Sequence, residues 1–348
     1  MISARLHAAA LMLLAATPLA ANGPLRVVVT GVTDAQLATI KKAAPDVQVI
    51  FATPKDLKDK VVDADALIGS CAREIVTAGK KLKWVQSHSA GVENCLYPEI
   101  ADSPIVLTSS KILQGPEIAD HAFALLLALT RGIRLAVPNQ LNEDWGRTTY
   151  REMVGGPAQK GFLPIELRGK TALVIGVGGI GVQVAERAAA FGMKVLGIDP
   201  KDMPHSRDIE HVGQPEDLMQ LLPQSDAVFM CAPNTSRTTG MMGPEQFAAM
   251  KKGSYYVAVS RGRNTQTDAL VAALLSGHLA GAGLDVVDPE PLPKGHPLWK
   301  LANVVITPHI AGRSDGEWDR RMDLITDNIQ RFSKGLPLRH VIDKKEGY

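Results

Sequence analysis

The chain has 348 residues, of which 45% are hydrophobic and 21% charged, and its formal net charge is +2. This length predicts about two domains, and the apolar fraction is ample for packed cores. The net charge is close to zero and the sequence has no run of Lys and Arg, so nothing indicates a nucleic-acid-binding surface. Small partners without a large net charge are favoured.

The first 22 residues differ from the rest of the chain. Arg5 precedes an Ala/Leu-rich stretch, 8–16, followed by Pro18 and small residues, and this order resembles an export signal with a short hydrophobic region. The stretch is too short and too Ala-rich to span a membrane as a helix. The alternatives are a disordered extension or a true start at Met12.

Short apolar runs alternate with helical patterns between residues 23 and 116. This alternation predicts a smaller parallel α/β domain. The expected strands are 25–30, 47–51, 65–69, 83–87 and 105–108, and the expected helices include 33–44 and 73–80.

A long apolar-rich helix is expected from 117 to about 135, after Gly115-Pro116 breaks the chain. We interpret it as the first crossing between domains, because its ends are too polar for a membrane span. The stretch 139–164 is polar and punctuated by Gly and Pro, which predicts a loop that wraps the surface or a partner subunit.

The turn around which the chain is organised follows an apolar strand, 171–175. Gly176, Gly178 and Gly181 have the spacing G-x-G-x-x-G, and 182–191 has apolar residues at helical spacing. The first glycine permits a sharp turn, the second lets the backbone approach a pyrophosphate, and the third lets helix and strand pack closely. The phosphates would lie at the helix N-terminus, where free N–H groups point at them.

Asp199 ends the next strand, 194–198, about 20 residues beyond the glycines, where an acidic side chain accepts from the ribose hydroxyls. A carboxylate there would repel a 2′-phosphate, so we predict NAD rather than NADP. The alternative is an ordinary βαβ unit in which Asp199 is a solvated residue at the end of a strand.

The alternation continues to the end of the chain and predicts a sheet of six parallel strands. Its ligands would lie beyond the carboxyl ends of the strands. A helix from 315 to about 334 would cross back and place the C-terminus with the first domain. The further strands are 226–231, 254–259, 280–284 and 303–306, and the further helices are 215–222, 244–250 and 267–276.

The three cysteines, Cys71, Cys95 and Cys231, are scattered, without a C-x-x-C pair or a neighbouring His at ligand spacing. We therefore expect buried free thiols, and neither a disulfide framework nor a metal site.

Three strand ends carry side chains suited to chemistry. Arg261 follows the strand 257–259, Glu290 lies in a Pro-rich loop after Leu284, and His309 follows the last strand. Each has an ordinary alternative: a salt bridge for the Arg, a solvated loop charge for the Glu, and a capped loop histidine for the His.

At these residues the sequence resembles the NAD-dependent D-2-hydroxyacid dehydrogenase family, over nearly the whole chain after the first 22 residues. The resemblance implies two doubly wound parallel-sheet α/β domains, with a Rossmann NAD-binding domain (117–312) inserted into a smaller flavodoxin-like substrate domain (23–116 and 313–348). The matching motifs are the glycine turn 176–181, Pro233-x-Thr235-x-x-Thr238, Ser260-Arg261-Gly262, the spacing from Asp285 to Glu290 with Pro291-Leu292-Pro293, and the segment 307–312.

The resemblance implies Arg261, Glu290 and His309 as the catalytic trio. Reduction of a 2-oxo acid needs a hydride from the cofactor and a proton at the carbonyl oxygen, which His309 can give near neutral pH. Glu290 would hold the other imidazole nitrogen, and Arg261 would clamp the substrate carboxylate with its fork. Ser89, Ala90 and Gly91 match the family's carboxylate-binding loop, with Ala90 and Gly91 as N–H donors.

Further residues are carried over as contacts of the cofactor. Asp285 is expected at the carboxamide side of the nicotinamide, with a helix or turn cap as the alternative. His88 is expected to line the substrate pocket and His121 to be structural. The full set of expected cofactor residues is Gly176, Gly178, Gly179, Ile180, Gly181, Asp199, Cys231, Pro233, Thr238, Ser260, Asp285 and Gly312.

Two positions depart from the family pattern. Gly179 replaces the Arg of many relatives, which removes a side-chain contact to the pyrophosphate, and Asp120 replaces a frequent Glu.

The first interpretation is thus a D-2-hydroxyacid dehydrogenase that acts mainly as a reductase of a small 2-oxo acid such as glyoxylate or hydroxypyruvate. The alternative is a dinucleotide-sensing, corepressor-like binding protein on the same fold. We expect a homodimer, as in the family, and no nucleic-acid or membrane partner. The need to recycle NAD favours the cytoplasm, whereas a working signal in residues 1–21 would direct the chain to the periplasm.

Overall fold

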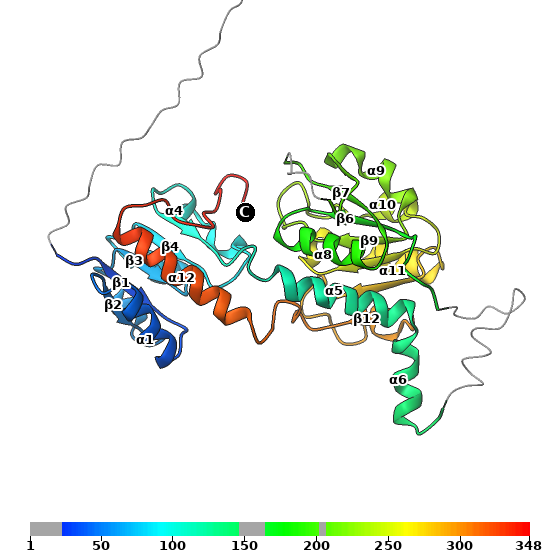
Figure 1. The fold of residues 1–348 in the computed structure, drawn as a ribbon, viewed down its shortest axis with the longest axis horizontal. Helices are drawn as coiled ribbons and strands as arrows, with labels where there is room; N and C mark the ends of the chain where they lie inside the picture. Colours follow the sequence, from blue (N-terminus) through cyan, green and yellow to red (C-terminus); the bar gives the residue numbers. More distant parts are fainter. Residues whose placement is uncertain (1–22, 146–163, 202–206) are drawn as a thin grey trace, which may run out of the picture.

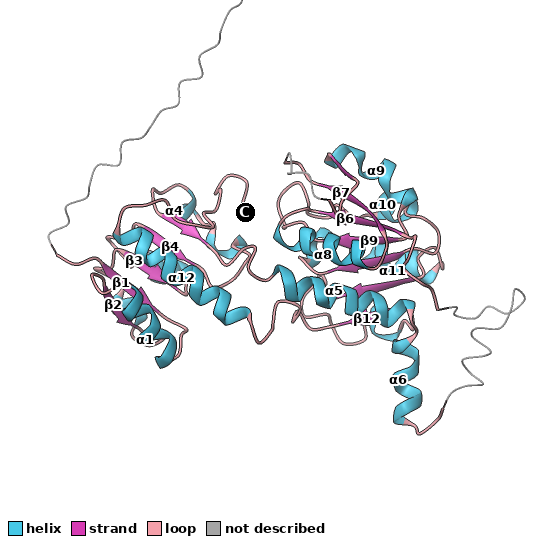
Figure 2. Cartoon of the chain, viewed as in Figure 1, coloured by secondary structure: helices cyan, strands magenta, loops and turns pink. Residues whose placement is uncertain are grey.

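The computed structural model of the chain describes residues 23–145, 164–201 and 207–348. The N-terminal segment 1–22 and most of the predicted loop 139–164 lie outside the described residues. Figure 1 shows two α/β units, each built on a parallel sheet, and Figure 2 shows helices lying against both sheets. The predicted fold class is therefore confirmed.

The first sheet has five strands in the order β2-β1-β3-β4-β5 within the described residues, and all neighbours run parallel. Its inner strands are mostly buried and apolar, as expected of a parallel sheet covered on both faces, whereas the edge strand β2 is partly exposed. The strands are β1 (Arg26–Val29), β2 (Gln48–Phe51), β3 (Ala66–Ile68), β4 (Trp84–Gln86) and β5 (Val106–Thr108), and the helices beside them are α1 (Asp34–Ala43), α2 (Leu57–Lys60), α3 (Arg73–Val76) and α4 (Pro98–Ala101).

The second sheet has seven parallel strands in the described residues, in the order β12-β11-β10-β9-β6-β7-β8. The prediction of six strands was wrong because β8, only three residues long, was missed. The strands are β6 (Thr171–Ile175), β7 (Lys194–Ile198), β8 (His211–Gly213), β9 (Ala227–Met230), β10 (Tyr255–Ala258), β11 (Gly281–Leu284) and β12 (Val304–Ile306), and the helices of this unit include α8 (Gly179–Ala190), α9 (Leu218–Leu221), α10 (Pro244–Ala249) and α11 (Thr267–Leu275).

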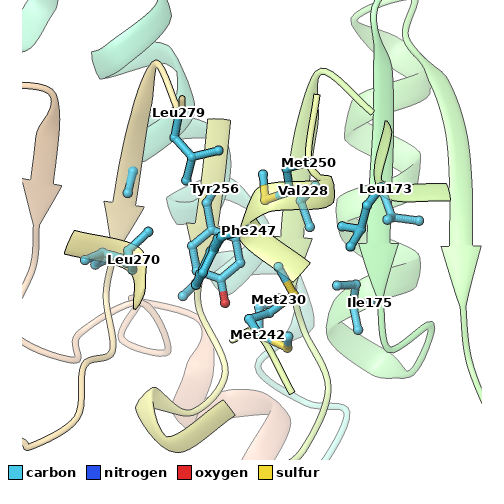
Figure 3. Packing of buried hydrophobic residues seen from close by; sticks show 14 of the residues in the cluster. Leu173, Ile175, Val228, Met230, Met242, Phe247, Met250, Tyr256, Leu270 and Leu279 are labelled. Atoms are coloured by element: carbon cyan, nitrogen blue, oxygen red, sulfur yellow. The ribbon is translucent and has the colours of Figure 1, made fainter. Parts of the chain in front are cut away.

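One side of this second sheet packs on a large buried cluster (Figure 3). Phe247 of α10 meets Tyr256 of β10 edge to face, with ring centroids 5.3 Å apart. Fully burying side chains of this size stabilises the fold by about 1.5–3 kcal/mol each. The cluster makes the strands a rigid support for the loops that follow their carboxyl ends.

The first crossing between the sheets is made by two helices rather than the predicted single one. α5 (Gly115–Thr130) ends before Gly132, whose φ of +71° breaks the helix, and α6 (Ile133–Leu141) continues at an angle of 73°. α5 begins at Gly115, because Pro116 fits the first turn of a helix rather than breaking it. In the described residues no single helix is long and apolar enough to cross a membrane, although this bent pair passes that test together.

The return crossing is α12 (Glu317–Ser333), which lies over the first sheet beside α1 (Figure 1). Its Ile325 and Ile329 are buried in one cluster with Val27 and Val29 of β1. The amide of Asn328 donates to Gln86 of β4 at 3.0 Å. The last helix of the chain is therefore part of the core around the first sheet.

The prediction of free thiols was wrong for two of the three cysteines. Cys71 and Cys95 form a disulfide with a Cα–Cα distance of 5.4 Å, which joins the loop after β3 to the 3₁₀ helix η1 (Glu93–Cys95). Their 24-residue separation carries no motif, so only the fold brings them together. Cys231 is a buried free thiol, and burial raises its pKa to about 12.

Candidate active site

The glycine turn connects β6 to α8. Gly176 has a φ of +89°, which favours glycine, and a Cβ at Gly181 would overlap the carbonyl oxygen of Gly176. A Cβ at Gly178, in contrast, would meet no atom within 4 Å. α8 begins at Gly179, three residues before the predicted start, so the free N–H groups of its first turn lie at the turn itself. An open cradle beside a helix N-terminus fits the pyrophosphate of a dinucleotide.

Gly179 packs closely against the turn that precedes α5. A Cβ there would come within 2.7 Å of the Cα of Ile112. Any residue with a Cβ at this position would require this backbone to shift. Asp120, the other departure, accepts from Arg187 of α8 at 2.6 Å.

Asp199 follows β7 and is 8% exposed. One carboxylate oxygen accepts from the N–H of Val177 and the other from that of Lys201, both at 2.9 Å. Because each oxygen carries two lone pairs, one on each remains for ribose hydroxyls. A cavity of about 200 Å³ opens beside it at the ends of β6 and β7, lined among others by Pro233 and Thr238.

His309 lies in the turn after β12, an edge strand of the second sheet. This turn follows the carboxyl end of its strand, as the cavity beside Asp199 does, but lies several strands away from that cavity. Its Nδ1 is 2.6 Å from Oε1 of Glu290, and both side chains are close to half exposed, at 45% and 40%. The backbone of His309 has a φ of +54°, which is sparsely populated outside glycine. With Nδ1 held by the carboxylate, Nε2 is the nitrogen that can exchange a proton with a ligand.

Asp285 holds this histidine turn in place. It is 2% exposed, and its carboxylate accepts from the hydroxyl of Thr307 and the N–H groups of Ile310 and Ala311 at 2.6 to 2.9 Å. Its backbone oxygen also accepts from the N–H of His309. The structure thus gives Asp285 the turn-cap contacts considered as the alternative, and its contact with the cofactor stays a prediction.

Arg261 reaches from the end of β10 to the loop after β4. Its Nε donates to Oε1 of Glu93 at 2.8 Å, and a Cβ on Gly91 would overlap its guanidinium. The guanidinium therefore lies directly against the loop expected to bind the substrate carboxylate. The sequence did not predict a role for Glu93. Its carboxylate accepts from Nε of Arg261, one of the guanidinium donors that a substrate carboxylate would use.

Comparison with known proteins shows the family. The family model of the D-isomer specific 2-hydroxyacid dehydrogenase NAD-binding domain matches residues 123–311. The chain is 33% identical over 288 residues to a glyoxylate reductase of Korarchaeum cryptofilum, covering 81% of this chain and 83% of that protein. The chain belongs to the D-isomer specific 2-hydroxyacid dehydrogenase family.

Other members are similar over most of the chain. A D-3-phosphoglycerate dehydrogenase of Methanocaldococcus jannaschii is 31% identical over 298 residues, which is 84% of this chain and 54% of that protein. The crystal structure of a family protein from Aeromonas salmonicida superposes with a TM-score of 0.78 and 28% identity, covering 92% of this chain and all of that one. The chain is thus a nicotinamide-dependent oxidoreductase, and membership favours an enzyme over the corepressor-like alternative.

In this dehydrogenase the loop expected to bind the substrate carboxylate, 89–91, is held by hydrogen bonds to neighbouring serines. The N–H of Ser89 donates to Ser87, and the carbonyl oxygen of Ala90 accepts from the hydroxyl of Ser109, both at 3.1 Å. Because the N–H of Ser89 is engaged, the N–H groups of Ala90 and Gly91 are the candidates for binding a carboxylate.

The two competing histidines have structural contacts. His88 Nε2 is 3.0 Å from the carbonyl oxygen of Thr30, and burial lowers the pKa of His88 below its usual value. Its ring meets Trp318 edge to face. His121 Nε2 is 2.8 Å from the hydroxyl of Thr307, so His121 supports the turn that carries His309.

Most of the remaining cofactor candidates lie in the loops that follow the strands of the second sheet, and Ile180 lies in the first turn of α8. Cys231 donates its N–H to Ile175, the hydroxyl of Thr238 donates to Pro233 at 2.6 Å, and Gly312 accepts from Gln114. The Cys231 side chain is buried, so it can offer only backbone to a ligand. Ile180 and Ser260 lie beside the glycine turn and Arg261, respectively.

Proposed function

We propose that this dehydrogenase transfers a hydride between NAD(H) and C2 of a small D-2-hydroxy acid or 2-oxo acid. His309 is the acid/base, paired with Glu290, and Arg261 clamps the carboxylate. The observation that carries the proposal is the 2.6 Å contact between His309 Nδ1 and Glu290, at the same sheet edge as an arginine that lies against Gly91. A lone capped histidine would not need a carboxylate partner, whereas Arg261 does form the salt bridge considered as its alternative, with Glu93.

Each residue of the trio would have a separate role in the reaction. The bound cofactor supplies the hydride. Arg261 and the N–H groups of the carboxylate loop fix the substrate, and His309 Nε2 gives the carbonyl oxygen its proton as negative charge develops. Glu290 stabilises the imidazolium before the transfer and keeps the ring oriented. In the direction of oxidation the same nitrogen accepts the hydroxyl proton.

The test is NADH consumption by the purified chain with glyoxylate, hydroxypyruvate, pyruvate and phenylpyruvate, followed by chiral analysis of the product where C2 becomes a stereocentre. We expect turnover with the smaller oxo acids and a D product. If no oxo acid of the panel is turned over while NADH binds, the substrate assignment is wrong.

We also propose that NAD is preferred over NADP because of Asp199. Asp199→Ala should relax the preference for NADH over NADPH, since the carboxylate that repels a 2′-phosphate is gone. The same change frees the N–H groups of Val177 and Lys201, which affects both cofactors, so the measured quantity is the ratio of the two kcat/KM values.

Asp226→Ala is the matched control for this ratio. Asp226 likewise accepts a backbone N–H at 2.9 Å, from Thr171, but it lies at the amino end of β9, away from the cofactor pocket. The control should leave the ratio unchanged. An unchanged ratio in Asp199→Ala as well would remove Asp199 from this role.

We propose a homodimer that uses α6. This helix projects from the body of the molecule in Figure 1, and Ile133, Val137 and Leu141, four residues apart along one face, are 46–78% exposed. Trp145 just beyond it is 90% exposed. An apolar stripe of this kind indicates a protein interface.

Leu141→Asp should therefore convert the dimer to a monomer, as measured by sedimentation velocity, because it places a charge within a desolvated contact. Leu275→Asp is the control, since Leu275 of α11 is 66% exposed but lies outside this stripe. A wild-type chain that sediments as a monomer, or a variant that stays dimeric, contradicts the assignment.

The domain boundaries also stay a proposal: a substrate domain of 23–116 and 313–348 and a cofactor domain of 117–312. The packing of α12 on the first sheet supports the second part of the substrate domain. The pairing of Val341 with Thr108 of β5 supports it as well.

A further inference from the structure

The cavity beside Asp199 has an unexpected wall. Lys345, Glu346 and Tyr348, from the last four residues of the sequence, line it together with the loops after β7 and β9. In Figure 1 this red segment lies between the two α/β units. No motif in the sequence marked it.

The segment is anchored firmly on the first sheet. Val341 pairs with Thr108 of β5, and Ile342 is 4% exposed and donates its N–H to Leu107 at 2.9 Å. The ammonium group of Lys344 donates to the carbonyl oxygens of Ile100 and Ser103 at 2.8 Å each. Residues 345–348 therefore start from a fixed point on the first sheet.

From that point the segment contacts two loops of the second sheet. Glu346 Oε2 is 2.6 Å from Nη2 of Arg237, in the loop after β9. The ammonium of Lys201, in the loop after β7, is 4.1 Å from the centroid of the Tyr348 ring, which is the geometry of a cation–π contact. The N–H groups of Lys345 and Glu346 bond to Asp343, so the segment is a turn held by its own hydrogen bonds.

The position of the cavity identifies which part of the cofactor it would take. The acidic residue at the end of the second strand of a dinucleotide fold faces the adenosine ribose, and Asp199 lines this cavity. His309, at the reacting end, follows β12, which is the edge strand on the far side of β6 from β7. The volume of about 200 Å³ is below the roughly 300–1,000 Å³ of sites that enclose a whole ligand, so the cavity suits one part of a dinucleotide.

We propose that residues 345–348 form the outer wall of the adenosine site and hold the adenosine part of the dinucleotide in place. Tyr348 offers a flat ring to the base, and the ion pair between Glu346 and Arg237 closes the wall on the second sheet. The proposal rests on the binding of a nicotinamide dinucleotide and on the adenosine assignment of this cavity, and it is independent of the 2-oxo acid. In this arrangement both α/β units contribute to cofactor binding far from the reacting carbon.

The first test is calorimetric binding of ADP-ribose, which carries the adenosine end, and of NMN, which carries the other end. Deletion of 345–348 should weaken ADP-ribose binding about tenfold, equivalent to about 1.4 kcal/mol, and leave NMN binding unchanged. The release of NADH, followed by stopped-flow fluorescence, should become faster by a similar factor. Unchanged ADP-ribose affinity overturns the proposal, and tighter binding shows instead that the segment blocks the site.

Tyr348 provides a test without a deletion. Tyr348→Phe keeps the ring and should keep the ADP-ribose affinity, whereas Tyr348→Leu should lose most of what the deletion loses, because the flat face for the base is gone. Equal affinities in the Phe and Leu variants would overturn the role of the ring.

The ion pair is tested by charge exchange. Glu346→Gln should speed NADH release about two- to fivefold, the range of an exposed ion pair. The double variant Arg237→Glu with Glu346→Arg should restore slow release if the pair closes the wall. If the exchange fails to restore slow release, Arg237 contacts the nucleotide itself. That result would overturn the role of the ion pair in closing the wall.

The control exchange is Arg73→Glu with Glu99→Arg. This pair has a similar N–O distance, 2.7 Å against 2.6 Å, and similar exposure, 61% and 37% against 69% and 41%. It lies on the first unit, outside the cavity, and should change neither ADP-ribose affinity nor NADH release. Because every readout is a binding measurement, failure of the proposed 2-oxo acid turnover would leave these results interpretable.

Discussion

His309→Ala is expected to reduce turnover by at least about a hundredfold, the range of general acid catalysis, and to leave NADH binding little changed. The reason is positional: Glu290 engages Nδ1, so the imidazole presents Nε2 to a ligand, and no alanine can donate a proton there. The measurement is kcat for the best oxo acid, with the dissociation constant of NADH determined separately.

Two further variants make this result specific. Glu290→Gln retains an oxygen that accepts from Nδ1 but removes the charge that stabilises imidazolium. It should therefore reduce turnover, but by less than His309→Ala does. His278→Ala should retain full turnover, because His278 contacts Met250 at the amino end of the sheet. If His309→Ala turns over substrate near the wild-type rate, His309 is not the proton donor.

The fold was predictable because its strands carry their own signal. A strand of a parallel sheet is buried on both faces, so β1, β6 and β10 are continuous hydrophobic runs that periodicity detects. β8 has only the residues His-Val-Gly and stands at the edge of the sheet, where one side has no neighbour. Its assignment as a strand comes from pairing with β7 and not from its composition.

Helix limits were less predictable because single residues decide them. The apolar pattern runs through Gly132 without interruption, and a glycine inside a helical pattern is tolerated in many proteins. Here Gly132 adopts a left-handed conformation, and the chain bends by 73° between α5 and α6. Sequence periodicity reports which face is apolar and cannot report this turn of the axis.

The candidate site likewise has some contacts that the sequence predicts and others that it does not. The pair of His309 and Glu290 could be expected, because both residues lie in motifs of the resembling family. The contacts of Arg261 with Glu93 and of Arg237 with Glu346 join the two α/β units across 168 and 109 residues of sequence. Contacts of that kind depend on how the units pack, which no local pattern specifies. The disulfide of Cys71 and Cys95 lies within the first unit and was missed because its 24-residue spacing carries no motif.

The glycine turn allows cofactor binding and folding to be separated by two substitutions of the same kind. Gly178→Ala adds a methyl group in open space, and the φ of −79° at this position suits alanine. The free energy of unfolding without cofactor should therefore be unchanged. The methyl group lies where the pyrophosphate must approach the backbone, so NADH binding should weaken by roughly tenfold or more, equivalent to about 1.4 kcal/mol.

Gly181→Ala should show the opposite pattern. Alanine gains about 1 kcal/mol of helix propensity over glycine, but its Cβ would overlap the backbone oxygen of Gly176, and no rotamer can relieve a backbone clash. Overpacking of this kind costs about 1–3 kcal/mol, so the variant should be less stable in urea denaturation even without cofactor. If Gly178→Ala binds NADH as the wild type does, the pyrophosphate does not lie at this turn, because no other atom within 4 Å of that methyl group could account for a change.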